Sequence, residues 1–302
     1  MSFKNQSAVT ACSHHRVGFH ASITGGFSHA IAEGEAFGCE VIQIFTKSNR
    51  QWHASPIDPK ELERYHAARE KSLISTIFGH SGYLINPAAD NPDVLQKSRD
   101  SLLLELNRSA QLKLPFLVLH PGAAKSQSEE AALKAVIESL EWVFARTDSP
   151  TKIALEVTAG SGTVLGSKLE QIAWLLDNAP STDRLAVCLD TCHLFASGYD
   201  FRTAADIEKF LKTFKKLIPW KRVAAVHMND SQGDLGCRKD RHETLGNGRI
   251  GWECFQTIMR HPDFAELPLC MEIPPGGEGR PNDVVALKKL KAARGNKKVE
   301  ER

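Results

Sequence analysis

Eight apolar runs recur along this chain at near-regular intervals, and six of them end in a histidine, an aspartate or a glutamate. Apolar runs of this length between turn residues are typical of buried strands. Residues of the type that binds metals close six successive strands, so the pattern predicts a cation site at one end of one sheet. The six closing residues are His80, His120, Glu156, Asp190, His227 and Glu272.

Segments with helical periodicity alternate with these runs, as in a parallel sheet built from strand–helix units. Two earlier runs, at 16–22 and 40–46, supply two more strands. Eight such units predict a closed (β/α)8 TIM barrel, a fold that typically takes about 250 residues and can take more. Active sites of these barrels lie at the C-terminal ends of the strands. All six closing residues are expected at that end.

Composition favours one folded catalytic domain, with 42% hydrophobic residues, 25% charged residues and a net charge of +2. We expect the barrel over 16–293, between a flexible N-terminal extension over 1–15 and a basic flexible tail over 294–302. No run is long enough to span a bilayer, and the N-terminus lacks the apolar core of a secretory signal. A cytoplasmic location without a membrane partner is therefore expected. Seven scattered cysteines indicate reduced thiols rather than a disulfide framework.

Three further residues enlarge the candidate cation site. His193 follows Asp190 by three positions, which brings both side chains to one face if the chain turns helically after the strand. Asp240 and His242 share a face if their loop is extended. Five histidines and four carboxylates exceed one tetrahedral site and suit two or three zinc-like ions. Mixed imidazole and carboxylate donors without thiolate favour zinc, manganese or iron over magnesium or calcium.

The charge of such a site indicates its substrate. Three divalent ions exceed the charge of four carboxylates, and clustered metals commonly serve phosphodiester hydrolysis. Because the whole chain carries only +2, nucleic acid would have to be held by local basic patches, whatever its base sequence. The candidate patches are Lys47 with Arg50, then Arg238, Lys239 and Arg241, and finally Arg249.

Nine segments carry a resemblance to a known family: GFHASITGG, IFTKSNRQW, HSGYLIN, LHPG, EVTAGSG, LDTCHLFASGYD, VHMNDS, GCRKDRHETLGNGRIG and the late ME. In this order they resemble the signatures of endonuclease IV, the zinc-dependent apurinic/apyrimidinic endonuclease family on the xylose isomerase-like barrel. The resemblance extends from about residue 16 to 290. It implies three zinc ions per chain, with manganese or iron possible at some positions. Their implied ligands are His80, His120 and Glu156 for the first, Glu156, Asp190, His227 and Glu272 for the second, and His193, Asp240 and His242 for the third.

The resemblance also implies an activity. The chain would hydrolyse the phosphodiester 5′ to an abasic site in double-stranded DNA and leave a 3′-hydroxyl, through a metal-bridged hydroxide beside the bridging ligand Glu156. Arg50, Tyr83 and Leu84 would enter the duplex and fill the gap, at a cost that is lowest where stacking is already lost. Such an enzyme is expected to act as a monomer and to be associated with the nucleoid through DNA.

Three positions depart from the family pattern. Val157 and Ile273 follow two of the proposed ligands, and Gly82 precedes Tyr83 in an altered loop. These departures concern metal tuning and loop stiffness rather than ligation.

Two other functions stay open at this stage. A metal-dependent sugar isomerase or epimerase on the same barrel would use the Glu, Asp, His and Glu at the late strand ends. It would not need, as a group, the additional donors His80, His120, His193, Asp240 and His242.

The third candidate is a DNA-damage sensor with structural zinc and no turnover. The complete ligand sets argue against it.

Overall fold

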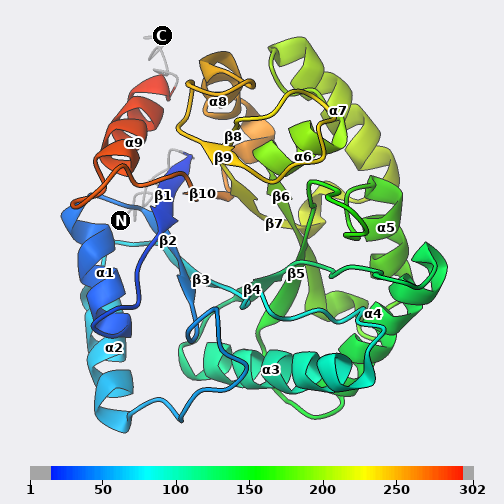
Figure 1. Cartoon of the computed structure of the whole chain (residues 1–302). Coiled ribbons are helices and arrows are strands. Elements are labelled where there is room, and N and C mark those ends of the chain that lie inside the picture. Colours follow the sequence, from blue (N-terminus) through cyan, green and yellow to red (C-terminus); the bar gives the residue numbers. More distant parts are fainter. Residues whose placement is uncertain (1–14, 295–302) are drawn as a thin grey trace, which may run out of the picture.

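A computed structural model describes residues 15–294 of the chain. Within that part, eight parallel strands close into a barrel in the order β1-β10-β7-β6-β5-β4-β3-β2 (Figure 1). The predicted (β/α)8 TIM barrel is thereby confirmed. The strands are β1 (Arg16–His20), β2 (Val41–Phe45), β3 (Thr76–His80), β4 (Phe116–Leu119), β5 (Lys152–Glu156), β6 (Leu185–Asp190), β7 (Val223–His227) and β10 (Pro268–Met271).

Helices surround the barrel and connect successive strands (Figure 1). Several begin where a side chain caps the free N–H groups of the first turn, as Asp58, Asn91, Ser128 and Thr203 do. The helices are α1 (Phe27–Ala36), α2 (Pro59–Lys71), α3 (Pro92–Gln111), α4 (Glu129–Phe144), α5 (Leu169–Asn178), α6 (Thr191–Ser197), α7 (Ala204–Leu217), α8 (Trp252–Ile258) and α9 (Pro281–Ala293).

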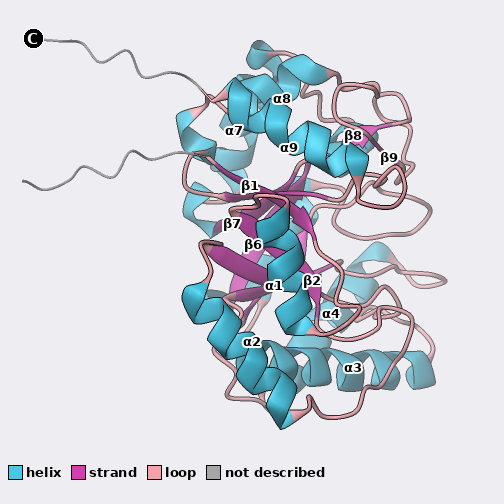
Figure 2. Cartoon of the chain, turned by 90° about the vertical axis from the view of Figure 1, so that its left-hand side faces the viewer, coloured by secondary structure: helices cyan, strands magenta, loops and turns pink. Residues whose placement is uncertain are grey.

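Three short elements lie at the C-terminal rim of the barrel. Helix α6 begins directly after β6, so the chain does turn helically after Asp190. Strands β8 (Asp230–Ser231) and β9 (His242–Glu243) pair antiparallel and lie beyond the barrel strands, at the right of Figure 2. Sequence periodicity does not reveal these elements, because they are too short to show a repeat.

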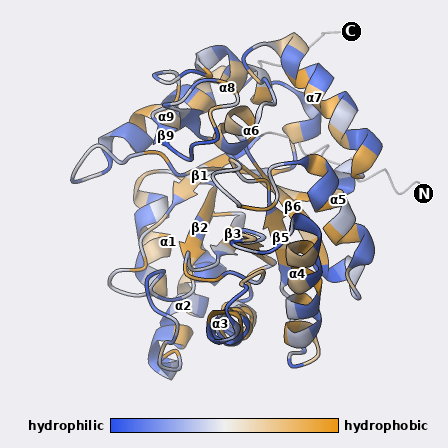
Figure 3. Ribbon diagram, turned by 45° about the vertical axis from the view of Figure 1, so that its right-hand side comes forward, coloured by the Kyte–Doolittle hydropathy of each residue, from blue (hydrophilic) through white to orange (hydrophobic). Residues whose placement is uncertain are grey.

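Side-chain alternation along the strands explains why the candidate ligands share one space. The barrel strands are largely hydrophobic, whereas the helices carry both hydrophobic and hydrophilic residues (Figure 3). Alternate strand residues point into the barrel, where a separate apolar cluster fills the interior. Six members of that cluster each precede a candidate ligand by two positions, so the ligands continue the same inward-facing rows. These members are Phe78, Val118, Ala154, Cys188, Ala225 and Cys270.

The ends of the described chain contact the barrel. The imidazole of His15 forms a hydrogen bond with the carbonyl of His261, and the distance from Nε2 to the carbonyl oxygen is 3.0 Å. Arg294 forms an ion pair with Glu40. The rest of the predicted extension and tail, residues 1–14 and 295–302, lies outside the described residues. None of the described helices is long and apolar enough to cross a membrane.

One buried carboxylate organises the loop over 244–251 at the rim. Asp230 is 0% exposed and accepts backbone N–H bonds from five residues. The backbone approaches it so closely that a Cβ at Gly248 would lie 2.4 Å from Asp230 Oδ1. Only glycine fits there. The five donors are Ser231, Gly246, Gly248, Ile250 and Gly251.

We expect Asp230→Asn to lower the free energy of unfolding by about 2 kcal/mol, because an amide leaves some of these buried N–H groups without an acceptor. Urea unfolding measures the loss, and faster hydrogen exchange at Gly246 and Gly248 should accompany it. The matched control is Asp234→Asn in the same region, where the side chain is 85% exposed. Equal stability of the two variants would contradict the anchoring role.

Candidate metal centre

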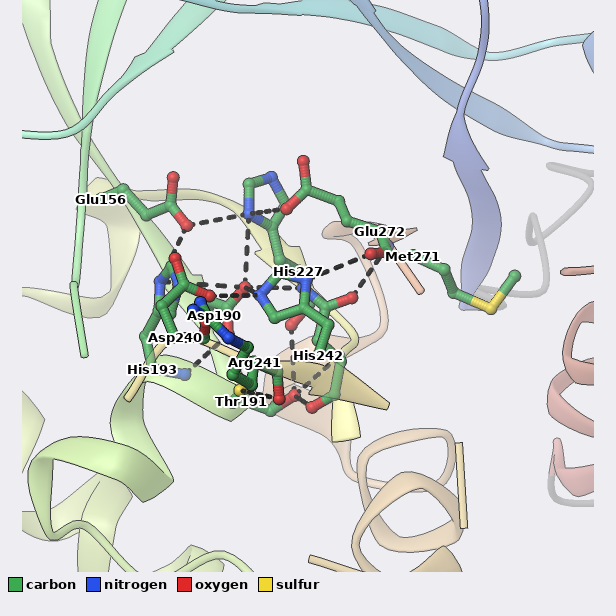
Figure 4. Close-up of polar contacts among 12 residues, drawn as sticks. Glu156, Asp190, Thr191, His193, His227, Asp240, Arg241, His242, Met271 and Glu272 are labelled. Atoms are coloured by element: carbon green, nitrogen blue, oxygen red, sulfur yellow. Dashed lines mark hydrogen bonds and ion pairs between the residues drawn. The ribbon is translucent and has the colours of Figure 1, made fainter. Parts of the chain in front are cut away.

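The nine predicted metal donors come together at the C-terminal end of the barrel. Figure 4 shows seven of them converging from β5, β6, α6, β7, β9 and the residues beside β9 and β10. Among the described residues, three groups of donor atoms lie close enough together to hold a metal ion. The groups are His80 with His120 and Glu156, then Glu156 with Asp190, His227 and Glu272, and finally Asp190 with His193 and His242.

The first group forms around one oxygen of Glu156. Nε2 of His80 lies 3.2 Å and Nε2 of His120 lies 3.0 Å from Glu156 Oε2. His80 Nδ1 lies 2.7 Å from the carbonyl oxygen of Ser81. That contact favours the tautomer that leaves Nε2 free to bind a metal.

The second group uses the other oxygen of the same carboxylate. His227 Nδ1 lies 3.1 Å from Glu156 Oε1, 3.3 Å from Glu272 Oε2 and 3.7 Å from Asp190 Oδ2. Glu156 therefore links the first two groups through its two oxygens, in the position that the sequence analysis assigned to a bridging ligand. Three carboxylates around one imidazole form a strongly cation-attracting site.

The third group differs from the expected set, because Asp190 belongs to it in place of Asp240, which lies beside its two histidines. Asp190 Oδ2 lies 3.7 Å from His242 Nε2. Asp240 Oδ1 lies 3.2 Å from His193 Nε2 and 3.3 Å from His242 Nε2. Burial would raise the pKa of Asp240, but the neighbouring imidazole of His193 lowers it to about 2. Asp190 thus links the second and third groups as Glu156 links the first and second.

Two buried imidazole nitrogens of the third group have no hydrogen-bond partner among the described residues. Nε2 of His193 and Nε2 of His242 are buried, and neither makes a hydrogen bond within the described residues, although both lie near Asp240. Buried nitrogens without a partner are costly. Two such nitrogens beside carboxylate oxygens fit a bound cation, so the residues suit a metal centre of imidazole and carboxylate ligands.

The charges of the centre support this fit. Burial alone would raise the pKa of Glu156, but the charges of His120 and His227 hold it well below the usual range for glutamate. Burial alone would lower the pKa of His193, yet Asp190 and its other acidic neighbours raise it well above normal. Protons and metals compete for such imidazoles, so metal affinity should fall as pH falls.

Gln43 supports the ligands from β2, and the sequence analysis did not single it out. Its Oε1 lies 2.7 Å from His227 Nε2, and its Nε2 donates to Glu272 Oε1 at 2.5 Å. His20, the last residue of β1, lies 3.2 Å from the same Glu272 oxygen. An acceptor on His227 Nε2 places the proton there and leaves Nδ1 for the metal. The signal in the sequence is one polar residue inside the apolar run EVIQIFT.

Asn229 supports two ligands at once from the residues after β7. Its Nδ2 donates to Asp190 Oδ2 at 2.6 Å, and its Oδ1 accepts the backbone N–H of Glu272 at 2.8 Å. The departures Val157 and Ile273 are both buried. The carbonyl of Val157 lies 3.0 Å from His193 Nδ1, a contact that depends on the backbone rather than on the side chain.

The predicted DNA-binding residues lie on two loops next to the metal centre. Tyr83 is 62% exposed, and its ring centroid lies 5.8 Å from that of His80. Leu84 is 37% exposed and Arg50 is also exposed. A cavity of about 350 Å³ is lined by Tyr83 and Leu84 and reaches His120. The expected patch over 238–241 and Arg249 are exposed at the same rim.

We expect Gln43→Leu to weaken zinc binding by about tenfold, as loss of a ligand's hydrogen-bond partner commonly does. Competition with a chromogenic chelator measures the affinity, and thermal unfolding shows whether the fold is kept. Gln111→Leu, an exposed position at the end of α3, is the control. Unchanged zinc affinity in Gln43→Leu would refute the supporting role.

Comparisons with known proteins agree with this geometry. The family described as xylose isomerase-like TIM barrel matches residues 31–292. A Chloroflexus aggregans protein named “Probable endonuclease 4” is 44% identical over 262 residues, which cover 86% of this chain and 92% of that protein. The crystal structure of endonuclease IV from Thermus thermophilus is 33% identical, with a TM-score of 0.80, over 92% of this chain and 98% of that one.

A D-tagatose 3-epimerase-like protein has the same fold, with a TM-score of 0.68 over 91% of this chain and 96% of that chain. At 17% identity, this likeness shows the architecture alone. The relatives named endonuclease 4, in contrast, match more than a third of the residues over most of the chain. The chain belongs to the endonuclease 4 family of xylose isomerase-like TIM barrels.

Proposed function

We propose that this chain is a metal-dependent DNA-repair endonuclease that hydrolyses the phosphodiester on the 5′ side of an abasic site and leaves a 3′-hydroxyl. One observation carries the proposal: eight donors form three groups that share Glu156 and Asp190, and Asp240 lies beside two histidines of the third group. The sequence analysis placed three zinc ions in these groups, and we retain that assignment. Asp190 is now a candidate ligand of two ions rather than one.

The chain supplies the surroundings for phosphodiester hydrolysis. Bound divalent ions would lower the pKa of a coordinated water and offset the negative charge that develops on the phosphate. Glu156 places the first two donor groups on either side of one carboxylate. The six predicted ligands at the strand ends all belong to donor groups, which is consistent with a mechanism that needs no separate side-chain base.

Recognition of a missing base needs side chains that fill a gap. Arg50, Tyr83 and Leu84, which we call the wedge residues, are exposed on loops beside the first donor group. Tyr83 packs edge-on against Phe45, with 5.5 Å between ring centroids. An aromatic ring that packs against a second ring of the protein is suited to enter a duplex where stacking is already weak.

A direct test uses a duplex with one synthetic abasic site and an undamaged duplex of the same sequence. We expect a single cut on the 5′ side of the lesion, a 3′-hydroxyl end and loss of cleavage after prolonged chelation. Intact DNA from zinc-loaded protein would refute the proposal. It would favour a silent damage sensor if the protein still bound the lesion, or a sugar epimerase if it did not.

Glu156→Ala should abolish cleavage and release metal, because it removes the carboxylate shared by two donor groups. Arg50→Ala should keep the metal content of the wild type and lose about tenfold in affinity for the abasic duplex, as removal of a stacking contact does. Metal analysis and a binding titration separate the two effects. Wild-type turnover in Glu156→Ala would exclude the metal-centred mechanism.

A further inference from the structure

The wedge residues come from two separate loops that must act together. Residues 46–58, the Arg50 loop, connect β2 to α2, and residues 81–91, the Tyr83 loop, connect β3 to α3. The donor groups of the metal centre include no residue of either loop. The relative position of the loops therefore has to be set by other contacts.

One buried carboxylate on α3 contacts both loops. Glu105 is 0% exposed and lies 3.1 Å from the ammonium of Lys47. Its second oxygen accepts the hydroxyl of Thr46 at 3.2 Å. Its first oxygen also accepts the backbone N–H of Gly82 at 3.0 Å. Two donors thus come from the Arg50 loop and one from the Tyr83 loop.

The same helix fixes both ends of the Arg50 loop. Arg108, almost one turn beyond Glu105, donates to the carbonyls of Thr46 and Ser55 at 2.7 Å each. Inside the loop, the ammonium of Lys47 donates to the carbonyl of Gln51 at 2.5 Å. The chain around Arg50 is therefore folded back on the lysine that pairs with Glu105.

The two loops also touch directly beside the wedge residues. A Cβ at Gly82 would lie 3.4 Å from the carbonyl oxygen of Asn49 and 3.4 Å from Lys47 Nζ. Asn49 immediately precedes Arg50, and Gly82 immediately precedes Tyr83. The backbones that carry Arg50 and Tyr83 thus meet at the ion pair of Lys47 and Glu105.

Stability alone does not account for this ion pair. Both side chains are almost completely buried, and burial raises the pKa of Glu105 even though Lys47 opposes the shift. Buried ion pairs often add nothing to stability compared with apolar residues of the same volume. The helix presents Leu102 and Leu106 to the core at 0% exposure on either side, whereas the atoms that meet Glu105 are polar groups of the two loops.

We propose that Glu105 and Lys47 are positioning residues that hold Arg50 and Tyr83 in one preorganised wedge. The inference rests on the proposed function, because it assigns DNA entry to these loops. A wedge whose two parts are already aligned loses less conformational freedom when it enters the duplex. The metal centre should not depend on this pair.

The test compares Glu105→Gln, Lys47→Met and the double variant with the wild type. Thr46→Val removes one hydroxyl and keeps the shape, so it supplies a mild variant that folds even if the others do not. Glu40→Gln is the matched control, because it removes the charge of another ion pair outside both loops. Arg50→Ala serves as the reference for loss of the wedge.

Three measurements are made on the zinc-loaded proteins. Steady-state cleavage of an abasic duplex gives KM and kcat. Fluorescence of 2-aminopurine opposite the abasic site reports wedge entry on a duplex whose 5′ linkage is a hydrolysis-resistant methylphosphonate. Metal analysis and thermal unfolding report the centre and the fold.

We expect Glu105→Gln and Lys47→Met each to raise KM by about tenfold through the extra ordering required on binding, with kcat nearly unchanged. The fluorescence change should shrink, and zinc content should stay at the wild-type level. Thr46→Val should show a smaller effect in the same direction. The double variant should resemble either single one, because both residues act through one contact.

Several outcomes would overturn the inference. Additive effects in the double variant would mean that Glu105 and Lys47 act separately. Wild-type KM and fluorescence in Glu105→Gln, Lys47→Met and Thr46→Val would refute the positioning role alone, provided that Arg50→Ala is impaired. Failure of the wild type to distinguish the abasic from the undamaged duplex would instead refute the proposed function itself.

Discussion

The structure depends on a carboxylate that is buried among imidazoles. Glu156 is 0% exposed, and nitrogens of His80, His120, His193 and His227 lie 3.0–3.2 Å from its oxygens. Removing such an ion from water costs several kcal/mol, which only nearby positive charge offsets. The C-terminal end of the barrel therefore attracts positive charge, whether as protons on the imidazoles or as bound metal ions.

The barrel and its loops meet this requirement in separate ways. Below Glu156, inward-facing apolar residues fill the interior, so the donors at the rim rest on a packed layer rather than on water. Above it, buried carboxylates order the neighbouring loops, with Asp230 under the loop over 244–251 and Glu105 under the two wedge loops. The barrel strands position most of the metal donors, while the buried carboxylates Asp230 and Glu105 position the loops around the donor groups.

The sequence predicts the barrel and the donors well because both follow from local patterns. A strand that ends in a ligand is visible within seven residues, as in RLAVCLD with Asp190, and the parallel topology then brings the strand ends together. The same logic placed His193, since a helix does begin after β6. These predictions need no knowledge of contacts between distant segments.

The supporting residues could not be predicted in that way. Gln43 forms a hydrogen bond with His227, 184 positions away. In the sequence it is only a single polar residue within an apolar run. Glu105 sits in a helix with many polar residues, and only the meeting of Lys47 and Gly82 identifies its role. The link of Asp190 to the third donor group depends on a 3.7 Å approach of His242 from a distant loop. Such roles are properties of tertiary contacts rather than of spacing.

The sharing of two carboxylates has a thermodynamic consequence for assembly of the centre. Glu156 belongs to the first and second donor groups, and Asp190 to the second and third. An ion bound in one group would change the charge and the orientation of a ligand in the next, so occupancy of each group would alter the affinity of its neighbour, and the effect would be reciprocal. With ions in all three groups, binding would be a linear series of coupled equilibria. Occupancy of the middle group would then connect the two outer ones.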